Sequence, residues 1–218
     1  ASGYASLLSN TTGSYNSAYG SFSLFSNTTG AYNTAIGRQA LVSNTTGISN
    51  TASGYVSLLS NITGSYNSAF GSFALSANTS GDYNTGIGRQ SLYNNTTGNN
   101  NSAIGYQAGF SLNSGSGNTF IGSSACDDVT SANNFFCFGN SMGTIFTANT
   151  STGHMVLGNG KGQITIDGDL YVTGSIYNSN GVVGIGQDTT VDESSEIQGS
   201  CNYIFPNQSI ETASNIKA

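Results

Sequence analysis

The sequence has few charged residues, and this shortage excludes several classes of function. Charged side chains make up 6% of the 218 residues, against about 25% in ordinary globular domains. Only four residues are Lys or Arg, and the formal net charge is −6. The chain therefore lacks the basic surface that neutralises nucleic-acid phosphates or holds a polybasic membrane anchor. We expect no nucleic acid among its partners.

Long apolar runs and catalytic motifs are missing as well. No run of about 18 apolar residues is present, so we predict no membrane insertion. His154 is the single histidine, and no phosphate-binding glycine loop, nucleophile elbow or zinc-protease motif occurs. The acidic pairs Asp127–Asp128 and Asp192–Glu193 lack the ligand spacing of calcium loops. We predict a protein that is not an enzyme and that has no catalytic residue, cofactor or metal site.

Proline occurs once, and 30 residues are glycine. This glycine content does not indicate disorder, because 12 Tyr and 11 Phe are spread through the chain. A disordered chain of Gly, Ser and Asn would carry few aromatic residues. Here the apolar residues recur at fixed intervals. An uncharged, polar and periodic sequence of this kind predicts a repetitive β structure.

A 17-residue repeat dominates residues 1–122. The unit "SYNSAYGSFSLFSNTTG" is followed directly by "AYNTAIGRQALVSNTTG", and a second period of 51 residues brings back the first unit after three. We use the word column for the residues that occupy one position of successive units. The chain begins within a unit, at "ASGYASLL", without the basic start and apolar core of a signal peptide. We therefore expect a mature or truncated piece.

Each unit is predicted to form one coil of a β-solenoid. Units rich in Asn, Gly, Ser and Thr are poor helix formers, whereas "NTAIG" and "QALVS" are short strand-like runs separated by turns. Stacked coils would lie ~4.8 Å apart, the spacing of paired strands. Asparagines inside such a stack satisfy one another by hydrogen bonds along it. The predicted internal ladder consists of Asn16, Asn33, Asn50, Asn67, Asn84, Asn101 and Asn118.

The units "NTAIGRQALVSNTTG" and "NSAIGYQAG" resemble the repeats of trimeric autotransporter adhesin heads, and related repeats of phage and giant-virus tail fibres. The resemblance covers about residues 1–122. It implies a left-handed β-roll, three chains side by side and a role in attachment. The fibres end in an intramolecular chaperone with a basic Arg-Leu-Lys start, which is absent here. Either the chaperone is cleaved off or this protein assembles without it.

Three domains are predicted from the change in pattern. Residues 1–122 form the solenoid, and residues 123–152, with a bulky aromatic patch, form a cap or transition region. Residues 153–177 alternate apolar and polar residues around glycine turns, which favours a β-rich, prism-like C-terminal stem over residues 153–218. This last part resembles the segment that precedes the chaperone in the fibres.

Three cysteines are present. Cys126 and Cys137 are candidates for an intrachain disulfide in an extracellular protein, which would leave Cys201 over. An odd cysteine can pair between subunits or be a small buried residue. The spacing of the three is not that of a zinc site.

The closing Asn-Thr-Thr-Gly turn contains the Asn-x-Ser/Thr acceptor sequence for N-glycans. Two interpretations remain open: a bare stacked corner, with Asn in a turn conformation that it tolerates, or an exposed row of glycan attachment points. The candidate acceptors are Asn10, Asn27, Asn44, Asn61, Asn78, Asn95, Asn149 and Asn207. The acceptor sequence also occurs at Asn94 and Asn100.

The sequence favours an extracellular structural or adhesive fibre subunit on a cell surface, a virion surface or a shed filament. Its main partner would be itself, as a homotrimer or as a head-to-tail filament joined through open solenoid ends. An alternative is a receptor-binding module that recognises surface glycans through aromatic residues. The candidates are Tyr19, Phe22, Phe70, Phe73, Phe135, Phe136 and Phe138. A third hypothesis, ice binding, rests on the turn columns that contain Thr11 and Thr12.

Overall fold

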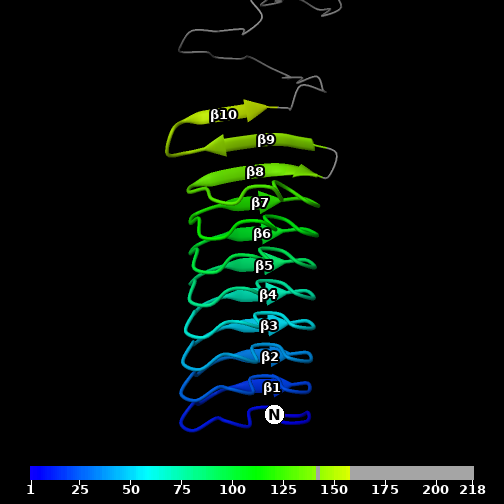
Figure 1. The fold of residues 1–218 in the computed structure, drawn as a ribbon, viewed down its shortest axis with the longest axis vertical. Helices are drawn as coiled ribbons and strands as arrows, with labels where there is room; N and C mark the ends of the chain where they lie inside the picture. The colour runs from blue at the N-terminus through cyan, green and yellow to red at the C-terminus, as the bar shows by residue number, and fades with distance from the viewer. Residues whose placement is uncertain (141–142, 158–218) are drawn as a thin grey trace, which may run out of the picture. The chain divides into compact units, whose positions relative to one another are not determined.

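A computed structural model describes residues 1–140 and 143–157 of the chain. In this part, ten β-strands and no helix are found, and the strands form one sheet in chain order (Figure 1). The strands are β1 (Ser17–Tyr19), β2 (Thr34–Ile36), β3 (Thr51–Ser53), β4 (Ser68–Phe70), β5 (Thr85–Ile87), β6 (Ser102–Ile104), β7 (Thr119–Ile121), β8 (Phe135–Asn140), β9 (Gly143–Asn149) and β10 (His154–Leu157). The prediction of an all-β solenoid with 17-residue coils is confirmed.

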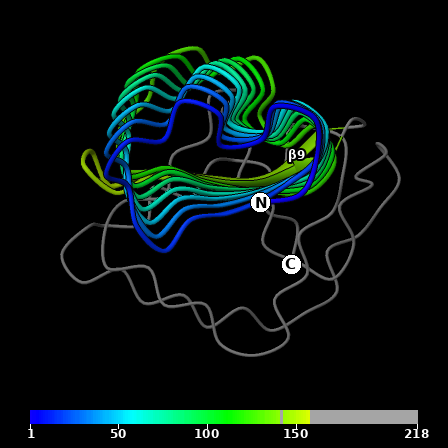
Figure 2. The same cartoon turned by 90° about the horizontal axis from the view of Figure 1, so that it is seen from below.

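Every coil is hydrogen-bonded to the next along most of its path. Strands β1 to β8 pair in parallel with residues 17 positions apart, so that Ala18 lies opposite Ala35 and Ala35 opposite Ala52. The turns stack in the same way, since the Thr28 N–H donates to the Thr45 carbonyl at 3.0 Å. Seen along the stack, the outlines of successive coils nearly coincide (Figure 2).

The core is narrow and is built from two apolar columns. The middle residue of each three-residue strand points inward, and the second column lies where the chain returns on the opposite wall. In the regular coils after the first, the members of both columns are fully buried. They are Ala18, Ala35, Ala52, Ala69 and Ala103 on the strands, and Leu24, Leu41, Leu58, Leu75 and Leu92 on the facing wall. A small residue opposite a large one fills the lumen without voids.

One glycine column keeps the coils at their close spacing. Gly71 has a φ of 134°, a value that residues with a side chain rarely adopt. A Cβ placed on it would stand 2.6 Å from the carbonyl oxygen of Gly88 in the next coil. The glycine that ends each strand therefore permits both the bend and the backbone contact between coils.

The coil geometry continues past Gly122, where the sequence repeat fades. Ser124 and Cys126 have φ values of 55° and 44°, in the columns of Gln39 at 60° and Leu41 at 52°. Strand β8 still pairs in parallel with β7, with Phe136 opposite Thr119. Only then does the chain change direction, and β9 and β10 follow as antiparallel strands. The predicted cap region thus contains a further solenoid coil; the predicted C-terminal stem lies, beyond Leu157, outside the described residues.

Candidate functional site

The predicted internal asparagine ladder lies inside the coils, immediately before the strands. The Asn50 N–H donates to the Asn33 Oδ1 at 2.9 Å, and the Asn33 Nδ2 donates to the Gly47 carbonyl at 2.8 Å. The same bonds recur from coil to coil. Asn16, the half-buried first member of the ladder, accepts from the Asn33 N–H. Six members are fully buried: Asn33, Asn50, Asn67, Asn84, Asn101 and Asn118. Each side chain links its own coil to a neighbouring one.

The asparagines of the Asn-Thr-Thr-Gly turns form a second buried ladder, so the turns have the geometry of the stacked corner and not that of an exposed row of acceptors. The Asn44 Nδ2 donates to the Asn27 Oδ1 at 2.8 Å and to the Gly47 carbonyl at 3.1 Å. Both protons of this amide are therefore used, and a glycan would need one of them removed. The same geometry holds for the fully buried Asn27, Asn44, Asn61, Asn78 and Asn95.

In each turn, the asparagine side chain points inward and the side chain of the second threonine points outward. Thr29 is exposed, and the first threonine, Thr28, donates its hydroxyl to the Thr45 carbonyl at 3.0 Å. The hydroxyl column of Thr11 is thereby engaged in stacking as well. A clue was present in the sequence: Ile62 replaces a threonine in one turn, whereas the asparagine is the same in all six turns.

The remaining acceptor sequences have different surroundings. Asn10, in the first turn, is half-buried and donates to the Gly13 carbonyl at 2.9 Å. Asn149 is half-buried at the end of β9, and its Oδ1 accepts from the Ser151 and Thr152 N–H groups. Asn94 is half-buried and Asn100 is exposed. Asn207 lies outside the described residues.

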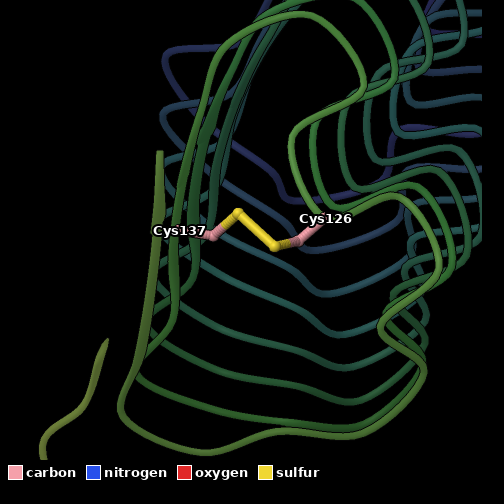
Figure 3. The surroundings of a disulfide bond; sticks show 2 residues. All are labelled: Cys126 and Cys137. Carbon is pink, nitrogen blue, oxygen red and sulfur yellow. A yellow bond between two sulfur atoms is a disulfide. The ribbon is translucent and has the colours of Figure 1, made fainter. Parts of the chain in front are cut away.

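A disulfide joins Cys126 to Cys137 across the lumen of the last coil, as Figure 3 shows. Cys126 belongs to the leucine column and Cys137 to the alanine column, and their Cα atoms are 6.3 Å apart. The separation of 11 residues is also that between Leu24 and Ala35. The disulfide therefore replaces the leucine–alanine contact of the regular coils by a covalent bond. Cys201 lies outside the described residues.

One coil before the disulfide, the sizes of the two core columns are exchanged. Gly109 stands in the leucine column and Phe120 in the alanine column. Phe120 is fully buried, and a Cβ added to Gly109 would stand 2.7 Å from the Phe120 Cδ2 atom. The phenyl ring thus occupies the space that a leucine side chain fills in other coils.

The outward face of the sheet carries two rows of different chemistry. One row is hydroxylic and consists of Ser17, Thr34, Thr51, Ser68, Thr85, Ser102 and Thr119. The other row, which we call the apolar stripe, contains Tyr19, Ile36, Phe70, Ile87 and Ile104, with side chains 41–56% exposed. The order of hydroxyl, small and apolar residues in β1, β2, β4, β5 and β6 was the sequence signal for these rows.

The aromatic residues suggested for glycan recognition do not form one site. Tyr19 and Phe70 lie on the apolar stripe, while Phe22 packs edge-on against Tyr4 and Phe25. Phe73 contacts Tyr55 and Tyr93 on the same side as Phe22. Near the end of the stack, Phe135 contacts Phe120, Phe136 contacts Phe146, and Phe138 is exposed.

The two arginines of the described coils lie on the surface, one three coils beyond the other. The guanidinium of Arg38 lies 5.7 Å from the ring centre of Tyr55, and Arg89 lies at the same distance over Tyr106. Such cation–π contacts at exposed sites contribute about 0.5–1 kcal/mol each. The 51-residue period thus repeats a surface feature as well as a sequence.

Comparison with known proteins gave no match among family models, curated proteins or solved structures. Within residues 1–140 and 143–157, no group of three or more metal-ligating side chains comes together. In the same part of the chain, no helix has the length and apolar character needed to span a bilayer. The surface rows and the buried ladders are therefore the features from which a function must be argued.

Proposed function

We propose that this chain is a non-enzymatic, extracellular structural subunit of an adhesive fibre, and that it assembles with copies of itself. The apolar stripe on the sheet is the face through which copies associate. A homotrimer of side-by-side solenoids is the expected assembly, in keeping with the resemblance of the repeat to trimeric adhesin heads and tail fibres.

The exposed apolar stripe is the observation that carries this proposal. Tyr19, Ile36, Phe70 and Ile87 leave 41–56% of their side chains in contact with solvent, in a row along the stack. A group of large apolar side chains gathered on one face marks an interaction surface more often than isolated exposed residues do. Strands β1, β2, β4, β5 and β6 each add a large apolar residue to the row, and β3 places Ser53 between Ile36 and Phe70. A second solenoid with the same rise per coil would match this row along its length.

Two further features support the proposal, one for a location outside the cell and one for a structural role. The Cys126–Cys137 disulfide is a bond that forms and persists in oxidising compartments. In the described coils, no buried side-chain nitrogen or oxygen lacks a hydrogen-bond partner. The polar interior therefore serves to join coil to coil, which suits a load-bearing rod.

The mass of the full-length protein in solution tests the proposal, with a matched pair of variants. Ile36 on the stripe and Ile62 in a turn are each 46% exposed. We expect a trimeric mass for the wild type by sedimentation equilibrium. Ile36→Asp would weaken association at least 100-fold, because each copy would bury an unpaired carboxylate. Ile62→Asp would leave the mass unchanged.

A monomeric wild type at high concentration would contradict self-association. Equal effects of Ile36→Asp and Ile62→Asp would place the contact elsewhere than on the stripe. Far-UV circular dichroism of both variants would show that the solenoid is intact, because both side chains lie outside the core.

A further inference from the structure

A surface column rich in tyrosines runs along the stack beside the internal ladder, and a serine interrupts it between two pairs of tyrosines. We call it the tyrosine column; it consists of Tyr15, Tyr32, Ser49, Tyr66, Tyr83 and Asn100. All six residues have left-handed backbones, with φ between 55° and 61°. Left-handed φ is uncommon for residues other than glycine. Its recurrence shows that the coil imposes it at this position.

The tyrosines of this column stack in two separate pairs. The ring centres of Tyr15 and Tyr32 are 4.9 Å apart with an interplanar angle of 11°. Those of Tyr66 and Tyr83 are also 4.9 Å apart, with an angle of 2°. All four side chains are exposed, Tyr32 by 60% and Tyr66 by 46%. The rings of each pair are therefore nearly parallel, and their centres are spaced by about the rise of one coil.

Ser49 interrupts the stack without disturbing the backbone. The Ser49 N–H donates to the Ala31 carbonyl at 2.9 Å, just as the Tyr32 N–H donates to the Ser14 carbonyl at 2.9 Å. Tyr32 and Tyr66 are two coils apart, so at the strand spacing the centres of their rings are about 10 Å apart. We call this space the Ser49 gap. Its depth along the stack equals that of one missing ring.

A ligand in the Ser49 gap must present an apolar face to each wall. A pyranose ring does so when all its substituents are equatorial, because only axial C–H groups then point to its two faces. Such a ring also carries hydroxyls around its edge. The gap offers them polar groups, namely the Ser49 hydroxyl at its base and the phenol hydroxyls of Tyr32 and Tyr66, which have no hydrogen-bond partner among the described residues. Aromatic walls with a few polar groups are typical of small-molecule sites.

We propose that the Ser49 gap binds one sugar unit of a β-1,4-linked polysaccharide with equatorial substituents, of the cellulose or chitin type. Because the linkages at both ends are equatorial, the neighbouring sugars continue in the plane of the bound ring. The polysaccharide can therefore cross the stack between the two tyrosine rings. An axial linkage or an axial hydroxyl would direct an oxygen at one of the rings. This inference goes beyond the proposed fibre role and does not depend on self-association.

Two hexasaccharides of glucose provide a matched test. Cellohexaose is β-1,4-linked and maltohexaose is α-1,4-linked, so they differ only in the direction of the linkage. We expect cellohexaose to bind the full-length protein at least tenfold more tightly in a saturation-transfer NMR titration, since the walls supply two aromatic contacts. Saturation should reach axial protons on both faces of the bound ring. Equal affinities, or no binding of cellohexaose, would overturn the proposal.

The protein side of the test adds a ring instead of removing one. Ser49→Tyr fills the gap at a residue whose backbone already has the conformation of its tyrosine neighbours, so the variant is expected to fold. It should lower the affinity for cellohexaose at least tenfold. Asn100→Tyr, in the same column beyond Tyr83, is the control and should leave the affinity unchanged.

Ser49→Tyr that binds cellohexaose as the wild type does would overturn the proposed site. The mass of the same variant by sedimentation tests the proposed self-association separately from sugar binding. The substitution should leave the apolar stripe and the assembly unchanged.

Discussion

The regular coils and the last coil of the solenoid have the same backbone but hold it together by different means. In the regular coils, alanine and leucine fill the lumen and two asparagine ladders connect neighbouring turns. Towards the end, Leu112 stands in the column of the turn asparagines, Phe120 replaces an alanine, and a disulfide replaces a leucine–alanine contact. The comparison shows that the coil needs a filled lumen and a paired backbone, whichever residues provide them.

At Gly109 and Phe120, two substitutions would convert the packing of the core into that of the regular coils. Phe120→Ala alone should lower the free energy of unfolding by about 4 kcal/mol, because it leaves a cavity beside Gly109. Adding Gly109→Leu should restore most of this loss, since the pair then equals the leucine–alanine pair of the regular coils. The φ of Gly109, 59°, is close to the 52° of Leu41, so the backbone accepts the leucine.

Chemical denaturation of the single and double variants measures the coupling between the two sites. Gly109→Leu alone should destabilise the protein, because its Cβ meets the Phe120 ring. Additive effects of the two substitutions would contradict the idea that one side chain fills the space left by the other.

The asparagine ladders provide the next comparison, between a buried and an exposed side-chain amide. Asn50→Ala removes the acceptor of the Asn67 N–H and the donor to the Gly64 carbonyl, both buried. Leaving these groups unpaired should lower the free energy of unfolding by about 3 kcal/mol. Asn134→Ala, in the last coil, removes one exposed bond to the Ser151 hydroxyl and should change it by about 1 kcal/mol or less.

Denaturant unfolding followed by circular dichroism gives both values. If Asn50→Ala were as mild as Asn134→Ala, the ladders would not be the main link between coils. The same experiment on Asn44→Ala would apply the comparison to the turn ladder, whose amide has two donated bonds.

The columns show which parts of this structure could be predicted from sequence. A strict 17-residue period fixes which residues stack, so the solenoid and the alanine, leucine and asparagine columns followed from it. The period does not say which way a turn side chain points. Asn-Thr-Thr-Gly has the composition of an exposed corner, and Asn44 nevertheless turns inward, where its amide has partners above and below.

The last coils of the solenoid could not be predicted from the repeat for a different reason. Pairs of substitutions such as Gly109 with Phe120 keep the summed volume of the core while removing the repeat from view. The spacing of Cys126 and Cys137, the same as that of Leu24 and Ala35, was the remaining signal of a further coil. The Ser49 gap could not be seen in one unit at all, because it is a property of three successive coils.

The disulfide allows a direct comparison between a covalent closure of the lumen and closure by packing, with a difference of only about 1 kcal/mol expected between the two variants compared. Replacing both cysteines by serine should lower the free energy of unfolding by about 3 kcal/mol, since it removes the crosslink and leaves polar groups in the lumen. Cys126→Leu with Cys137→Ala should lower it by only about 2 kcal/mol, because it restores the packing pair of the regular coils while still losing the crosslink. Thermal unfolding with and without a reducing agent measures both variants against the wild type. The reducing agent should lower the wild-type midpoint and leave both variants unaffected. If the leucine–alanine variant were no more stable than the serine variant, the last coil would depend on the crosslink alone, and the equivalence of the two core columns would be wrong.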